Sequence, residues 1–269
     1  MRTYSLAYLT ANASTVPQAV RIAADLGYAY VGLRVQPNGP GAPFQTLIGD
    51  AAVLRETQAL MRDTGVGVYD LEIIRIGEQF NLADHAALMD IGQILGAKAV
   101  LIAADDTNES RLADNYARLC DAMRPYGLTA DLEFMPWTAV KDAKSALRVI
   151  DLAGRPSNAG ILVDALHFGR SHTTLQDIAA IPRELLHYAQ MCDAQSGFNF
   201  TTEELIHTAR QERLLPGEGN IDVTGLFQTL PQELPVSVEI VNLERSKPIG
   251  DKAWSELCLN ATKKVLGGA

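Results

Sequence analysis

Eight short runs rich in β-branched and aromatic residues alternate with longer helical segments along the whole sequence. Strands that alternate with helices in this way are typical of a parallel sheet. Eight such units, at intervals of about 30 residues, predict a closed α/β barrel, the (β/α)8 TIM barrel, that forms a single domain over residues 1–269. The expected strands are residues 3–9, 30–35, 66–74, 99–103, 129–134, 160–166, 186–192 and 236–241.

The helical segments between these strands support the same architecture. Several of them end at a glycine, the residue that most readily adopts the left-handed conformation found after helix ends. A doubly wound sheet is the rival arrangement, but no GxGxxG motif follows the first strand. The expected helices are residues 16–26, 50–64, 82–95, 109–126, 139–153, 175–181, 223–230 and 252–266.

One connection is unusually long and separates Cys192 from Ile221. Long loops inside compact domains are usually functional or disordered. The stretch TTEELIHTARQE within this connection has the pattern of a helix that begins at threonine. We therefore expect an ordered excursion over the active face of the barrel.

Charge and cysteine content narrow the range of partners. The formal net charge is −9 and the basic residues form no strong cluster, which argues against nucleic acid as a partner. No apolar run approaches the roughly 18 residues of a membrane span. The three cysteines are far apart and lack CxxC spacing, as expected for reduced thiols in a cytoplasmic protein. A small-molecule substrate or a metal ion is the better partner.

Polar residues stand at the ends of four consecutive expected strands: Glu133, Asp164, Gln190 and Glu239. Each lies between apolar neighbours that would face the outer helices, so all four side chains are expected to point into the barrel mouth. Active sites of such barrels lie at the C-terminal ends of the strands. Three carboxylates would repel one another there, and a divalent cation would remove that cost. Oxygen ligands favour Mn²⁺, Mg²⁺ or a related hard ion.

Four segments, GILVDALHFGR, YAQMCDA, RLLPGEGNID and VSVEIV, together resemble the xylose isomerase-like TIM barrels, the sugar phosphate isomerase/epimerase family. The resemblance covers nearly the whole chain and is strongest over residues 129–241. It implies one metal ion, held by Glu133, Asp164, residue 190 and Glu239. The family usually has histidine in the H-x-x-D phrase, whereas this chain has Gln190. An amide oxygen in that place favours Mn²⁺ or Mg²⁺ over Zn²⁺ or Co²⁺.

The resemblance also implies that Glu133 and Glu239 serve as acid and base. A metal that is chelated by a carbonyl and an adjacent hydroxyl would polarise the carbonyl and stabilise the enediolate. One glutamate would remove the proton next to the carbonyl and the other would return a proton elsewhere. His167 is expected to orient or polarise a substrate oxygen, although a histidine in a surface loop is the plainer interpretation.

Five further residues are candidates for substrate binding. Arg213 precedes the PGEG segment and could bind a hydroxyl, carboxylate or phosphate, or simply end a helix. Trp137 could form an apolar wall for the substrate or pack on the barrel rim. The other three either line the pocket or form surface ion pairs: Glu72, Arg75 and Arg34.

The leading functional hypothesis is a metal-dependent isomerase or epimerase acting on a small sugar or hydroxy-ketone. The alternative within the same fold is a dehydratase acting on a keto-inositol or a dehydroshikimate-like acid. A DNA-repair endonuclease would need several histidine ligands and a basic face, and the sequence has neither. Gln190 also leaves open a barrel that has lost its metal and its activity. The sequence is compatible with a homo-oligomer as well as a monomer.

Overall fold

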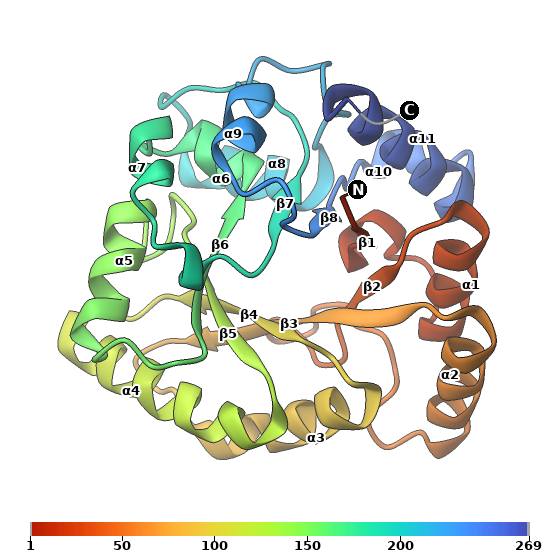
Figure 1. Ribbon diagram of the computed structural model, residues 1–269, viewed down its shortest axis with the longest axis horizontal. Helices are drawn as coiled ribbons and strands as arrows, with labels where there is room; N and C mark the ends of the chain where they lie inside the picture. Colours follow the sequence, from red (N-terminus) through yellow and green to blue (C-terminus); the bar gives the residue numbers. More distant parts are fainter. Residues whose placement is uncertain (1, 268–269) are drawn as a thin grey trace.

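The computed structural model, which describes residues 2–267, is a closed barrel of eight parallel strands in the order of the chain. Helices surround the barrel on its outside (Figure 1). This confirms the predicted single-domain (β/α)8 architecture. The strands are β1 (Tyr4–Leu6), β2 (Tyr30–Leu33), β3 (Gly67–Ile76), β4 (Ala99–Ala104), β5 (Thr129–Glu133), β6 (Ala159–Asp164), β7 (Ala189–Met191) and β8 (Val236–Val238).

Local signals fix where the helices begin and end. Thr15 forms a capping box with Gln18 at the start of the first helix, and Gly27 ends that helix with a φ of 80°. The helices are α1 (Val16–Leu26), α2 (Ala51–Thr64), α3 (Ala86–Leu95), α4 (Glu109–Met123), α5 (Ala143–Leu152), α6 (Ala165–Arg170), α7 (Leu175–Ala179), α8 (Thr202–Gln211), α9 (Val223–Thr229), α10 (Leu243–Ser246) and α11 (Gly250–Val265). The helix expected in the long connection is α8. Short 3₁₀ turns cover Tyr8–Ala11, Leu82–His85, Arg124–Tyr126 and Arg183–Leu185.

Several expected strands extend beyond the strands in the structure. Two of them, 3–9 and 236–241, end early at the barrel mouth. The predicted strand 3–9 ends at Leu6 because the chain turns into a 3₁₀ helix, and the strand 236–241 ends at Val238. Thr10 in that turn donates to the Val238 carbonyl at 2.8 Å and accepts from the Ile240 N–H at 2.7 Å. The Thr10 hydroxyl thus bonds to backbone groups on both sides of Glu239, just where β8 ends.

The predicted strand 160–166 ends at Asp164 for a different reason. The Asp164 carboxylate accepts from the backbone N–H groups of Leu166 and His167 and so caps α6, a helix that the sequence analysis did not anticipate. The predicted strand 186–192 starts only at Ala189, because Leu186 still belongs to the end of the preceding 3₁₀ turn.

Two apolar layers position the site. The larger layer lies between barrel and helices and includes Leu132, Val163 and Val238, the neighbours of the polar strand-end residues. A smaller cluster includes Tyr69, Leu162 and Tyr188. The ring centroids of Tyr69 and Tyr188 are 5.2 Å apart. The polar side chains at the strand ends therefore lie against closely packed apolar residues.

Within residues 2–267, no helix is both long enough and apolar enough to cross a membrane. The expected cytoplasmic location remains a prediction.

Candidate active site

The four polar residues predicted at the strand ends all lie at the barrel mouth. Glu133 and Asp164 are the last residues of β5 and β6, Gln190 lies within β7, and Glu239 directly follows β8. None of the four is more than 3% exposed. The N–H of Glu239 donates to the Met191 carbonyl at 3.1 Å, so pairing with β7 continues one residue beyond the assigned strand.

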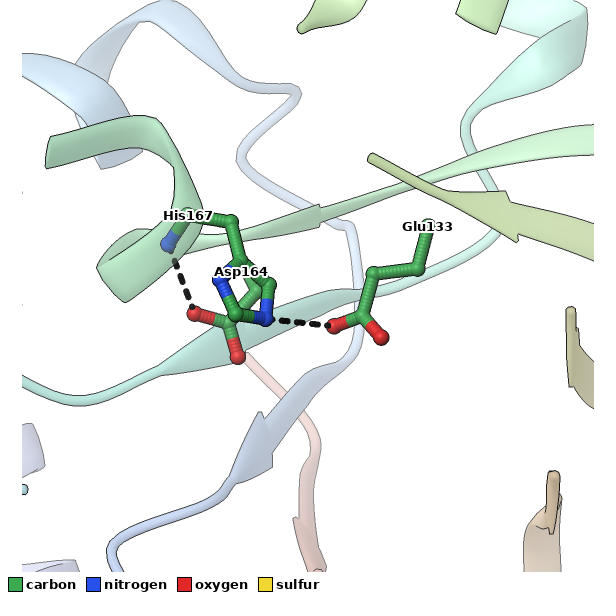
Figure 2. Close-up of side chains that lie close together, drawn as sticks. All are labelled: Glu133, Asp164 and His167. Atoms are coloured by element: carbon green, nitrogen blue, oxygen red, sulfur yellow. Dashed lines mark hydrogen bonds and ion pairs between the residues drawn. The ribbon is translucent and has the colours of Figure 1, made fainter. Parts of the chain in front are cut away.

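Three of the buried groups have the spacing of a metal-binding set. Glu133, Asp164 and His167 each offer one ligand atom, and these atoms lie within 4.8 Å of one another. The His167 ring nitrogen Nε2 is 3.6 Å from Glu133 Oε1, and its backbone N–H donates to Asp164 Oδ1 (Figure 2). His167 extends from the first turn of α6, and its ring lies edge-on to Trp137 at 5.0 Å between centroids. A buried position replaces the surface loop considered for this histidine.

Arg213 joins two of the predicted metal ligands. Its Nη1 atom is 2.6 Å from Asp164 Oδ2, and its Nη2 atom is 2.8 Å from Glu239 Oε2. The Nε–H of the same guanidinium donates to the Ala209 carbonyl at 3.1 Å. The side chain is fully enclosed, so Arg213 holds the two carboxylates together rather than ending a helix in solvent.

Gln190 has one satisfied and one unsatisfied end. Its Nε2 donates to Glu239 Oε1 at 3.0 Å. Its Oε1 is buried and has no hydrogen-bond partner among the described residues. A buried carbonyl oxygen without a partner is costly in an apolar interior, and a cation would relieve that cost. The orphaned oxygen fits the ligand role predicted for Gln190.

Charge is unbalanced around these residues. Four carboxyl groups are buried at the barrel mouth, namely those of Glu72, Glu133, Asp164 and Glu239, whereas only two guanidinium groups, those of Arg34 and Arg213, are buried beside them. With all six groups ionised, two negative charges remain uncompensated. One divalent cation or two bound protons would restore neutrality.

The pKa shifts show where protons are held when no cation is bound. Burial, together with repulsion from Asp164 and Glu239, raises the pKa of Glu133 well above its ordinary value. Burial and neighbouring carboxylates also raise the pKa of Glu239, despite the opposing charge of Arg213. Burial acts in the same sense on Asp164, but Arg213 and His167 outweigh it and lower the Asp164 pKa. In the absence of a cation the two glutamates therefore hold their protons to higher pH than Asp164 does.

His167 is neutral at physiological pH, because burial lowers the pKa of its imidazole to about 4. Its Nδ1 atom is buried without a hydrogen-bond partner in the described part of the chain. A neutral imidazole can bind a metal ion or exchange hydrogen bonds with a substrate hydroxyl.

The predicted substrate-binding residues line one small cavity of about 50 Å³ above this cluster. Arg34 is paired with Glu72 through two hydrogen bonds of 3.1 and 2.5 Å, so the interpretation as an ion pair applies, although this pair is buried. Arg75 is held by Asp105 through two bonds of 2.7 Å. The predicted residues on the cavity wall are Arg34, Glu72, Arg75, Glu133, Trp137, His167, Arg213 and Glu239.

Other cavities are larger, and one of about 330 Å³ lies on the far side of Arg75 and Asp105; the two largest described lie away from the strand ends. One, of about 870 Å³, lies between α1 and the segment around α10, and the other, of about 590 Å³, lies beside α8. Neither contains any of the four strand-end residues. The small cavity above the cluster is the candidate active site because the buried ionisable groups converge there.

Asp193 organises the PGEG segment that follows Arg213. Its Oδ2 atom accepts from the N–H groups of Gly217 and Gly219 at 2.9 and 3.0 Å, and its Oδ1 atom accepts from Ile221 N–H at 3.3 Å. A Cβ atom on Gly219 would lie 2.3 Å from the Ala194 carbonyl oxygen, which explains glycine at that position. The PGEG motif is thus a backbone cradle around one buried carboxylate.

We expect Asp193→Ala to lower the free energy of unfolding by about 3 kcal/mol, because several buried N–H groups lose their acceptor. Asp222→Ala is a matched control, since it removes a single capping bond at the start of α9 and should cost only about 1 kcal/mol. Urea unfolding of both variants measures the difference. Equal losses would show that Asp193 has no special role in holding this segment.

The sequence analysis missed Arg210 and Asn38, which also line the cavity. Arg210 lies in the last turn of α8, three residues before Arg213, and its closeness in sequence to Arg213 was the available signal. Asn38 follows β2 in a loop whose path the sequence does not reveal.

Comparison with known proteins agrees with this fold. The family model described as xylose isomerase-like TIM barrel matches residues 20–257. The 3-dehydroshikimate dehydratase of Pseudomonas aeruginosa is 27% identical over 177 residues, which cover 62% of this chain and 27% of that protein. The chain therefore spans only about a quarter of that curated relative.

Two solved structures share the fold. The IolI protein with a bound zinc atom has a TM-score of 0.79 and 18% identity, over 98% of both chains. D-allulose 3-epimerase from Methylomonas sp. has a TM-score of 0.68 and 16% identity, again over 98% of both chains. At such low identity these likenesses show the fold alone.

Proposed function

Because the chain belongs to the xylose isomerase-like TIM barrel family, we propose that it is a divalent-metal-dependent isomerase or epimerase. Its substrate would be a small sugar or hydroxy-ketone, and its reaction the movement of a proton next to the carbonyl group. The surplus of two buried carboxyl groups over buried guanidinium groups at the barrel mouth carries this proposal. Ligand atoms of Glu133, Asp164 and His167 lie within 4.8 Å of one another, which is close enough for one ion to contact all three.

The metal ligands in this proposal are Glu133, Asp164, Gln190 and Glu239, with His167 close enough to take part. Mn²⁺ or Mg²⁺ suits the oxygen atoms of this set. Zn²⁺ and Co²⁺ are further candidates, since the IolI structure contains a zinc atom. When bound, the ion would supply the positive charge that stabilises an enediolate.

The protein groups divide the remaining work. One glutamate, Glu133 or Glu239, takes the proton from the carbon next to the carbonyl, and the other delivers a proton to the product. Both carboxyl groups line the same cavity, so each can reach a substrate bound there. Neutral His167 holds a substrate hydroxyl, and Trp137 covers it from the side and helps to exclude water.

A metal-removal experiment tests this function. Protein purified without chelator should contain about one divalent ion per chain. Treatment with EDTA should abolish the incorporation of solvent deuterium into a panel of ketoses and hydroxy-ketones, and Mn²⁺ should restore it. Deuterium incorporation that is unchanged by EDTA, or absent with every compound in the metal-loaded protein, would contradict the proposal.

A dehydratase is the second candidate, favoured by the sequence match to 3-dehydroshikimate dehydratase. The same proton abstraction followed by loss of a β-hydroxyl would release water instead of an isomer. Loss of water leaves a double bond conjugated with the carbonyl group, whereas isomerisation does not. An increase in ultraviolet absorbance during the reaction would therefore identify the dehydratase. The small-molecule partner, the absence of nucleic acid and membrane partners, and the oligomeric state remain predictions.

A further inference from the structure

Three arginines border the cavity beyond the buried carboxylates: Arg34, Arg75 and Arg210. Arg34 forms an ion pair with Glu72, and Arg75 forms an ion pair with Asp105 through two of its three guanidinium nitrogens. Arg210 makes no ion pair and no side-chain hydrogen bond with any residue in the range 2–267. The cavity therefore has acidic groups on its floor and one uncompensated cation at its rim.

The backbone around Arg210 is held in place by contacts of its neighbour Ala209. Its neighbour Ala209 is buried, and the Ala209 carbonyl accepts the Nε–H of Arg213 at 3.1 Å. Arg213 is in turn bound to Asp164 and Glu239. The last turn of α8 is thus tied to the buried carboxylates, and Arg210, an exposed residue of that turn, borders the cavity.

Arg210 also stands close to other cations. Partial burial, together with repulsion from Arg75 and Arg34, lowers its pKa. The Nη1 atom of Arg75 has only a weak contact of 3.4 Å, to Asn38 Oδ1, because Asp105 engages the other two nitrogens. An anion placed between Arg210 and the Nη1 edge of Arg75 would relieve the repulsion and meet free N–H donors.

We propose that the substrate is a small hydroxylated carbonyl compound with an anionic group, a carboxylate or a phosphate ester, which Arg210 and Arg75 bind at the cavity rim. This inference rests on the proposed function in one respect: the reacting carbonyl occupies the same cavity, beside Glu133 and Glu239. The anionic group sets the orientation of the substrate and distinguishes it from neutral sugars.

Binding measurements on matched probes test the inference. Dihydroxyacetone, hydroxypyruvate and dihydroxyacetone phosphate are small hydroxy-ketones that are neutral, carboxylated and phosphorylated, respectively. Shikimate and its methyl ester form a second, cyclic pair. We expect wild-type protein at low ionic strength to bind at least one anionic probe about tenfold more tightly than its neutral counterpart, by ligand-observed NMR titration. A preference for carboxylate or for phosphate identifies the anion.

Arg210→Gln should remove this preference and leave the affinity for the neutral probes unchanged. Arg21→Gln is the matched control, because Arg21 is exposed, pairs with Glu56 on the outside of the barrel and should not affect the preference. Equal binding of charged and neutral probes by wild type would overturn the proposal, as would a preference that persists in Arg210→Gln.

The same titrations on Glu133→Gln separate this inference from the proposed function. This variant should lose deuterium exchange but keep the preference for anionic probes, because the preference depends on Arg210. An anion preference that depends on Arg210 supports the rim site even if no deuterium exchange is found with any substrate. Metal-dependent exchange without an anion preference would support the proposed function and reject the rim site.

Discussion

Glu133→Gln is expected to lower kcat by about 1000-fold, the usual contribution of a positioned acid or base. The amide cannot take a proton from carbon, although it keeps the shape of the carboxyl group. Glu239→Gln should have a comparable effect, because the proposed reaction needs one group to remove a proton and another to return it. The measurement is the rate of metal-dependent deuterium incorporation, or of turnover once a substrate is known.

Both variants should remain folded. In the metal-free protein the pKa of Glu133 is raised by burial, so its protonated form, which glutamine resembles, already suits the site. After Glu239→Gln, Arg213 keeps its ion pair with Asp164 and its bond to the Ala209 carbonyl. Glu233→Gln is the control, since Glu233 forms an exposed pair with Arg183 and should leave kcat unchanged. Turnover at the wild-type rate in both active-site variants would eliminate the acid–base assignment.

The placement of Glu133 and Asp164 was predictable because it depends on strand alternation. Leu132 and Val163 face the helices, so the next residue on each strand must face the barrel. His167 was harder to place, since it lies in a short helix that begins where the Asp164 carboxylate caps it. A side chain predicted as a metal ligand also ends a strand and starts a helix, and no periodicity in the sequence shows this.

The role of Arg213 depends on contacts that no local pattern encodes. It reaches Asp164 and Glu239 from a segment 49 residues after the first and 26 residues before the second. The sequence suggested that Arg213 binds a substrate or ends a helix, whereas the structure encloses its guanidinium group between two carboxylates. Arg210 was overlooked because two features mark it, its place on the cavity wall and its lack of an ion pair among the described residues. Both features depend on tertiary contacts, which the sequence does not show.

Position 190 connects these observations to the metal. The donor end of Gln190 is bound to Glu239, and its acceptor end is unpaired. Arg213 meanwhile places a positive charge on Asp164 and Glu239, two of the oxygen ligands that a metal would use. Arg213 competes with a divalent ion for these two carboxylates, and residue 190 offers that ion an amide oxygen in place of the imidazole nitrogen of a histidine.

Gln190→His is therefore expected to tighten the binding of Zn²⁺ on the order of 100-fold, since an imidazole nitrogen is a far better ligand for this ion than an amide oxygen. The gain for Mg²⁺ should be small, because this ion prefers oxygen. Isothermal titration of the metal-free protein with each ion measures both effects. Gln176→His, in an exposed turn of α7, controls for zinc bound by an added surface histidine. An unchanged Zn²⁺ affinity in Gln190→His would mean that residue 190 does not contact the ion, which would leave Glu133, Asp164 and His167 as the alternative ligand set.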